Sequence, residues 1–166
     1  MKAAGMALAV PVECLSIYRQ GMRMTSRTSG KAPLEDIKVP VKIKLAGLWA
    51  SLMFCYIYGD YFGLYQPGTL QDMLQGKMGP LGATTQGVLL GTSILMAVPS
   101  VMVFLSLVLK PVWSRVVNIV LGVFYALVMA VSMPGAWTFY LFFGVIEIVL
   151  SLLIVWYAWK WPRAPG

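Results

Sequence analysis

The fold of this chain is decided by its last apolar stretch, AWTFYLFFGVIEIVLSLLIVWYAW, which occupies residues 136–159. At a helical rise of about 1.5 Å per residue, this stretch is long enough to cross roughly 30 Å of hydrocarbon. Glu147 is its only charged residue. A carboxyl group at that depth costs on the order of 3 kcal/mol, which roughly a dozen Leu, Ile, Val and Phe side chains outweigh. The stretch therefore predicts a membrane-spanning helix that carries an acid in need of explanation.

Three further stretches have the same character, at residues 45–64, 86–109 and 112–133. The whole chain is 59% hydrophobic and only 11% charged, which lies outside the range of soluble domains. The short connections at Lys110-Pro111 and Met133-Pro134-Gly135 force consecutive helices to run in opposite directions. We therefore predict an all-α integral membrane protein, an antiparallel four-helix bundle.

The remaining segments surround this bundle. We expect residues 1–40 to form a flexible basic cytoplasmic leader, residues 41–161 the four-span membrane domain and residues 162–166 a tail. The external loop 65–85 should contain a short surface helix, because Thr69 can cap it, Asp72 suits its first turn and Gly76 can end it.

Basic residues predict the orientation. Apart from Lys77, those near the four spans lie before the first span, at or next to the joint between the second and third spans, or after the fourth span. The positive-inside rule then places both termini in the cytoplasm. Topology and anionic lipid headgroups account for the net charge of +7, so we expect a lipid bilayer and no nucleic acid as partner.

The residue types present exclude several chemistries. Histidine is absent, so we expect no haem and no zinc, and no other cofactor is indicated. Cys14 lies in the leader and Cys55 in the first span, and we expect neither a disulfide nor a metal pair between them.

Polar and small residues follow one face of each of the last two spans. In the fourth span they are Tyr140, Gly144, Glu147, Ser151 and Ala158, and in the third they are Asn118, Gly122, Tyr125, Met129 and Ser132. We expect the two faces to meet. Tyr125 and Glu147 lie at similar depths, so Tyr125 is the preferred hydrogen-bond partner of Glu147, whose carboxyl group we expect to be neutral.

Other residues are candidates for weaker reasons. Asp60 lies near the outer end of the first span, where a hydrated helix terminus and an inward ligand-facing acid are equally compatible with the sequence. Pro99 should kink the second span. Small residues spaced for close helix packing, within the bundle or in a homodimer or a complex with another membrane protein, are Gly59, Gly63, Gly87, Gly91, Gly122, Ala126 and Gly144.

Several segments together resemble a family of uncharacterised bacterial four-helix membrane proteins, a domain of unknown function. They are QGVLLG at residues 86–91, ILMAVP at 94–99, Asn118-Ile119, Ile146-Glu147-Ile148 and WYAWKW at 156–161. The resemblance extends from about Lys42 to Trp161 and implies the same four spans in the inner membrane of a bacterium, but no established activity. It also implies that relatives carry an acid at the position of Ala97, which argues against a two-carboxylate site in this chain.

Three hypotheses for function follow. The first is a membrane protein that binds or transports a proton or a small, lipophilic molecule through Glu147, assisted by Tyr125, Asn118 or Asp60. The second is a non-catalytic membrane subunit, in which Glu147 joins helices and the glycine faces bind a partner. The third and least favoured is an enzyme using a buried carboxylate, because no second positioned group other than a tyrosine is visible.

Overall fold

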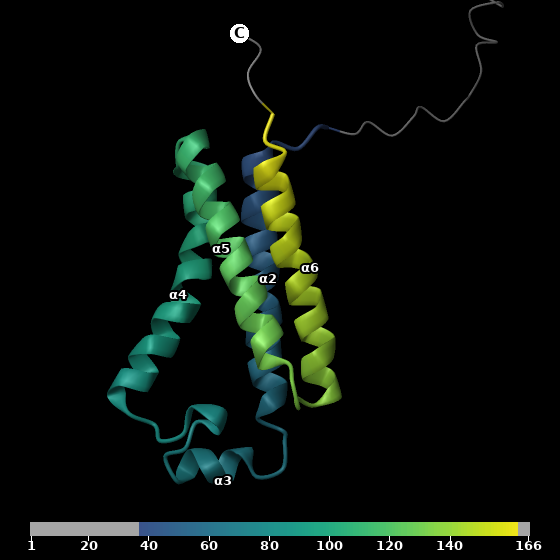
Figure 1. The fold of residues 1–166 in the computed structure, drawn as a ribbon. Coiled ribbons are helices and arrows are strands. Elements are labelled where there is room, and N and C mark those ends of the chain that lie inside the picture. The colour runs from purple at the N-terminus through teal and green to yellow at the C-terminus, as the bar shows by residue number, and fades with distance from the viewer. Residues whose placement is uncertain (1–36, 163–166) are drawn as a thin grey trace, which may run out of the picture. The chain divides into compact units, whose positions relative to one another are not determined.

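The computed structural model describes residues 37–162, and these form five α-helices and one 3-10 helix. The all-helical class is confirmed, since the described residues contain no strand beyond an isolated bridge between Lys77 and Ala83. Most of the predicted leader, including Cys14, and residues 163–166 of the tail lie outside the described residues. In chain order the elements are α2 (Val41–Gly63), α3 (Thr69–Leu74), η1 (Gly79–Leu81), α4 (Gln86–Val108), α5 (Pro111–Ser132) and α6 (Thr138–Trp159) (Figure 1).

Four of these helices are long and apolar enough to cross a membrane, and they match the predicted spans to within a few residues. The largest difference is in α2, which starts at Val41 rather than at residue 45. Its first turn carries Lys42 and Lys44, and the Lys44 amine lies 5.1 Å from the ring centroid of Tyr157 on α6. Lys42 Nζ donates to the carbonyls of Leu107 and Leu109, at 3.0 and 2.8 Å.

Two glycines allow α5 and α6 to pack closely. A Cβ at Gly122 would lie 2.8 Å from Val155 Cγ2, and one at Gly144 would lie 2.7 Å from Met129 Cε. Both distances are too short for a larger residue without a shift of the neighbouring side chain. α2 packs against both α4 and α6, while α4 and α5 touch over a short length. Figure 1 shows that α4 lies near α5 at its Val108 end and diverges toward its Gln86 end.

The other predicted packing residues meet no such neighbour. A Cβ at Gly59, Gly63 or Gly91 would have nothing within 4 Å, and one at Gly87 would approach only the hydroxyl of Thr85. Within the described residues, these glycines therefore bring no second helix close.

A proline inside α4 and the end of that helix each leave a backbone carbonyl without a helical donor, and side chains of other helices supply the missing hydrogen bonds. Pro99 is buried inside α4 and cannot donate to the carbonyl of Leu95, four residues before it. The hydroxyl of Tyr125 donates to that carbonyl at 2.7 Å. Leu107 lies in the last turn of α4, beyond which no helical N–H follows, and its carbonyl accepts from Lys42 of α2. Each of these carbonyls thus fixes a contact between helices.

The short helix predicted in the loop is present, but its start differs from the prediction. Gly68, with φ +91°, takes the N-cap position and Thr69 is the first helical residue. The expected capping by Thr69 is therefore wrong, because a left-handed glycine makes the turn instead. Asp72 lies in the first turn, and the apolar side chains Leu70, Met73 and Leu74 are at least half exposed, so they do not cover the long helices.

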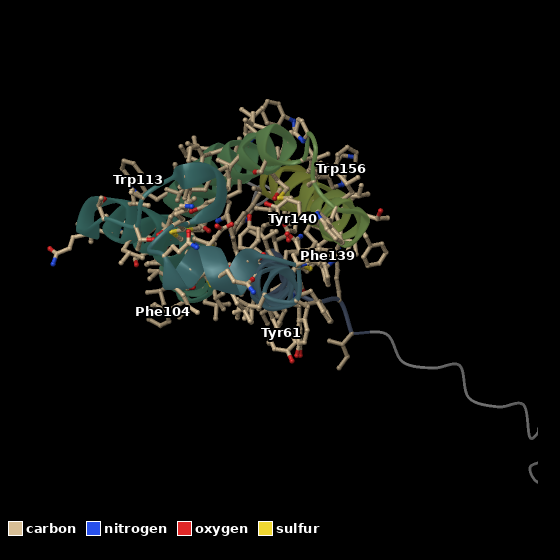
Figure 2. All side chains as sticks on the ribbon, turned by 90° about the horizontal axis from the view of Figure 1, so that it is seen from below. Tyr61, Phe104, Trp113, Phe139, Tyr140 and Trp156 are labelled. Carbon is tan, nitrogen blue, oxygen red and sulfur yellow. The ribbon has the colours of Figure 1, made fainter. Side chains whose placement is uncertain are left out.

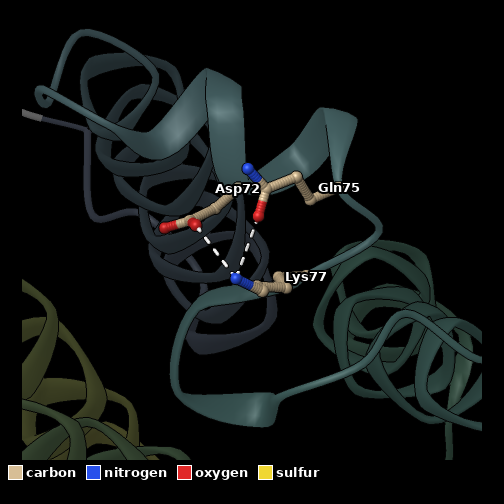
Figure 3. Close-up of polar contacts among 3 residues, drawn as sticks. All are labelled: Asp72, Gln75 and Lys77. Carbon is tan, nitrogen blue, oxygen red and sulfur yellow. Dashed lines mark hydrogen bonds and ion pairs between the residues drawn. The ribbon is translucent and has the colours of Figure 1, made fainter.

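The end of α3 is a Schellman turn. Gly76 has φ +69°, its N–H donates to the carbonyl of Met73, and the N–H of Lys77 donates to that of Asp72. Figure 3 shows the Lys77 side chain bonded to Gln75 and 3.8 Å from a carboxylate oxygen of Asp72. This ion pair is more than half exposed, so it contributes little to stability.

The link between Pro99 and Tyr125 makes a testable prediction. Tyr125→Phe should lower the free energy of unfolding by about 1 kcal/mol, because it leaves the Leu95 carbonyl unpaired in an apolar environment. In a Pro99→Ala background, residue 99 can donate to Leu95 itself, so Tyr125→Phe should cost clearly less. Unfolding of the four proteins in detergent measures this difference. Equal costs in the two backgrounds would contradict the link.

Candidate functional site

The faces of α5 and α6 that carry small and polar side chains are buried, and they share the core with residues of α2 and α4. On α5 the buried residues are Ser114, Asn118, Gly122, Tyr125 and Met129, and on α6 they are Gly144, Glu147, Ser151, Ile154 and Ala158. Ser132, expected on the α5 face, is exposed. The contacts of Gly122 with Val155 and of Gly144 with Met129 bring these two faces together. Polar groups in this core must be satisfied by one another or by something bound.

Asn118 lies at the centre of a hydrogen-bonded cluster at one level of this core. Its Oδ1 accepts from the indole Nε1 of Trp49 at 2.7 Å and from the hydroxyl of Ser106 at 3.3 Å. Its Nδ2 donates to the carbonyl and the hydroxyl of Ser114, at 2.7 and 3.3 Å. All four residues are fully buried. The cluster joins α2, α4 and α5, and uses the whole hydrogen-bonding capacity of the amide.

Tyr125 does not have the role that its depth predicted. Its hydroxyl donates to the Leu95 carbonyl of α4, and not to Glu147. The ring, only 2% exposed, packs edge-on against Trp49 with 5.8 Å between the ring centroids. The predicted pairing of Tyr125 with Glu147 is therefore wrong, because the phenol O–H donates instead to the Leu95 carbonyl that Pro99 leaves without a donor.

Glu147 and Ser151 differ from every other buried polar side chain of the described residues. Glu147 is 3% exposed and Ser151 is 1% exposed. The carboxyl oxygen Oε2 and the serine hydroxyl are buried, and neither has a hydrogen-bond partner. The two residues are four apart on α6, so they lie on one face, one turn apart. We call this pair the Glu147–Ser151 site.

Other polar groups lie within electrostatic range of the Glu147 carboxyl, namely the hydroxyls of Tyr56 and Tyr140 and the carboxyl of Asp60. Tyr56 also faces Tyr125, with 6.4 Å between the ring centroids. In the view from the α3 end, Tyr140 lies among the helices while Phe104 and Tyr61 lie at the periphery (Figure 2). The surroundings of the site are therefore aromatic and weakly polar.

Asp60 is exposed and lies three residues before the end of α2. Glu147 is buried, so the two carboxyls do not share one buried environment. An exposed acid in the last turn of a helix needs no partner inside the protein. Whether Asp60 is a hydrated helix terminus or a ligand-facing acid stays a prediction.

Of the four candidates from the sequence, only Glu147 thus combines burial with an unpartnered atom. Ser151, Tyr56 and Trp49 were not predicted as site or network residues. The sequence does place Ser151 on the inward face, one helical turn after Glu147, but it gives no sign that the serine hydroxyl lacks a partner. Trp49 offered a weaker signal, since an indole N–H in the middle of a span requires an acceptor. Tyr56 gave none, because its place depends on how α2 packs.

The chemistry available to this site is narrow. In the part of the chain that the structure describes, no group of three or more Cys, Asp and Glu side chains could hold a metal ion. One carboxyl and one hydroxyl can bind a proton, or accept hydrogen bonds from an ammonium, amide or hydroxyl group of a small ligand. A pocket of about 270 Å³ lies elsewhere, lined by Phe62, Tyr65, Gln66, Trp137 and Phe139, and neither Glu147 nor Ser151 lines it.

Comparisons with known proteins give one match. The model of a family described as "Family of unknown function (DUF6326)" matches residues 38–165. This agrees with the resemblance to a domain of unknown function. No curated protein matches the chain. No solved structure matches it either.

The Asn118 cluster leads to the second prediction. Asn118→Leu keeps the volume but leaves the Trp49 indole and the Ser106 hydroxyl unpartnered, so it should lower the free energy of unfolding by about 1–3 kcal/mol. Adding Trp49→Phe should then cost less than Trp49→Phe does alone, because its hydrogen bond is already lost. Ser132→Ala, at an exposed position of the same helix, is the control. Additive effects would show that the cluster does not link the helices.

Proposed function

Because the chain belongs to the DUF6326 family, whose function is unknown, its function must come from its own residues, and we propose a multi-pass membrane protein that binds a proton or a small molecule at Glu147. The observation that carries the proposal is the buried carboxyl oxygen of Glu147 without a partner, one turn from an equally unpartnered Ser151 hydroxyl. The membrane, the orientation and the site are argued in turn.

The membrane location is supported by where the apolar side chains lie. In each of the four long helices, less than a third of the most apolar segment is buried inside the protein. Large side chains along these helices face outward, such as Phe54, Leu90 and Val131, which is 80% exposed. Soluble proteins do not expose apolar surface on this scale, whereas lipid tails cover it without cost.

The orientation rests on the basic residues. Contacts place several of them at one end of the helices: Lys42 reaches the end of α4, Lys44 lies over the ring of Tyr157, and Arg115 lies over the ring of Trp159. Lys77 lies in the loop after α3. We propose that the basic end faces the cytoplasm of a bacterium and that the spans cross its inner membrane in alternating directions, with both termini inside.

Cysteine labelling tests this orientation. In a Cys14→Ser, Cys55→Ser background, a membrane-impermeant maleimide added to intact cells should label Lys77→Cys but not Lys110→Cys. Permeabilised cells should label both, since both positions are exposed. Labelling of Lys110→Cys alone in intact cells would reverse the orientation.

The binding role of Glu147 follows from comparison with the rest of the core. The amide of Asn118, the indole of Trp49 and the hydroxyl of Tyr125 are each paired within the protein. Glu147 is as deeply buried as these groups, but Oε2 bonds to none of them. A purely structural acid would be expected to join two helices, as Asn118 does. A carboxyl held unpaired at this depth is instead suited to bind a proton or a ligand group.

Ser151 and the nearby tyrosines define what would bind. The carboxyl and the Ser151 hydroxyl are on one face, so one small group with a hydrogen-bond donor could contact both. Tyr56 and Tyr140 contribute aromatic surface, which suits a lipophilic molecule. The site therefore favours a proton or a small lipophilic molecule that carries a donor, and movement of either through the protein would be transport.

The test compares Glu147→Gln with the wild type. Gln has almost the same shape but neither binds a proton at neutral pH nor offers a charge, so the variant should fold and lose function. Native mass spectrometry of gently solubilised protein should find a small molecule on the wild type and none on the variant. If the ligand is a proton, liposomes with an internal pH-sensitive dye should lose an imposed pH gradient more slowly with the variant.

Asp72→Asn is the matched control, because Asp72 is an exposed acid of α3, outside the long helices, and its loss of charge should leave both measurements unchanged. Ser151→Ala should weaken ligand retention while leaving the fold intact. Wild-type behaviour of Glu147→Gln in both assays would rule out the proposed function.

A further inference from the structure

A second pocket lies at the basic end of the helices, away from Glu147. It has a volume of about 580 Å³ and is lined by Arg115 of α5 and by Trp159, Lys160 and Trp161 at the end of α6. The pocket is therefore lined by two cationic side chains, one from α5 and one from the end of α6, and by two indole rings from the end of α6. We call it the Arg115–Lys160 pocket.

The cations of this pocket are held by aromatic rings. The guanidinium of Arg115 lies 5.8 Å from the centroid of Trp159, and the amine of Lys160 lies 3.9 Å from that of Trp156. Such contacts orient a cation but leave its charge uncompensated. The only ion pair among the described residues is between Lys77 and Asp72. The acidic residues in this part of the chain are Asp60, Asp72 and Glu147, and none of them lines the pocket. The described residues thus give the pocket no carboxylate of its own.

We propose that the Arg115–Lys160 pocket binds the phosphate headgroup of one anionic phospholipid. A planar guanidinium can donate two hydrogen bonds to a phosphate, and the Lys160 amine adds a second positive charge. Indole rings settle at the depth of the headgroups, where their N–H groups can donate to phosphate or ester oxygens. The acyl chains would then lie along the apolar outer faces of α5 and α6, where Val116 and Leu152 are at least half exposed.

The location argues for a lipid over a soluble anion. The pocket is at the end of two apolar helices, so a bound phosphate sits where bilayer headgroups are already concentrated. The proposal is independent of Glu147, since neither residue of the Glu147–Ser151 site lines this pocket.

Native mass spectrometry with added phosphatidylglycerol tests the pocket in the full chain. The double variant Arg115→Gln, Lys160→Gln should bind this lipid roughly 30-fold more weakly than the wild type, since each basic residue contributes a factor of about 5. Phosphatidylcholine should bind weakly to both proteins. Lys110→Gln is the matched control, because Lys110 is a basic residue between α4 and α5 that does not line the pocket.

Three outcomes would overturn the proposal: unchanged phosphatidylglycerol affinity in the double variant, an equal loss in Lys110→Gln, or equal wild-type affinity for the two lipids. Glycerol phosphate provides a further arm, and if it binds as tightly as the lipid, the site recognises a soluble phosphate instead. The unfolding temperature without lipid reports folding. If the double variant unfolds early, the single variants carry the same comparison, with roughly 5-fold losses expected.

Discussion

The hydroxyl of Tyr125 donates to the carbonyl of Leu95, which has no helical donor because residue 99 is a proline. This bond illustrates a constraint that the rest of the structure must also satisfy. In hydrocarbon, no water satisfies a backbone or side-chain polar group, so the protein must do so itself. Asn118 bonds donors and acceptors from three helices, and Lys42 donates to the Leu107 carbonyl at the end of α4. These bonds, with the close approach of α5 and α6 at Gly122 and Gly144, fix how the helices pack.

Against this background, Glu147 and Ser151 are exceptions that share one face of α6. The same core that pairs an indole, an amide and a phenol leaves a carboxyl oxygen and a hydroxyl unpartnered. Keeping them so costs stability, because a buried polar atom without a hydrogen bond is unfavourable by about 1–3 kcal/mol. Binding sites commonly retain groups of this kind, which destabilise the free protein and are satisfied by a ligand.

The spacing of apolar and polar residues along the sequence predicts most of the fold and part of the site. Helix lengths, the burial of Glu147 and the inward face of α5 all follow from spacing along single helices, which the sequence contains. Tyr125 went to Leu95 rather than to Glu147, because that choice depends on where α4 lies beside α5, and single-helix spacing holds no information about it. The hydrogen-bond partners of Trp49 and Ser106 could not be predicted for the same reason, since they also lie on other helices. Spacing also could not predict that Gly63 and Gly91 meet no neighbouring helix in the described residues.

The central claim is that Glu147 is kept for binding and not for holding helices together, and the stability of Glu147→Met tests it most directly. Methionine has a similar length and no polar atom that needs a partner, so replacing an unpaired buried acid with it should stabilise the ligand-free protein. Thermal unfolding in detergent should give a higher midpoint for Glu147→Met than for the wild type. A midpoint several degrees lower would show that the carboxyl holds the helices together, and would contradict the account.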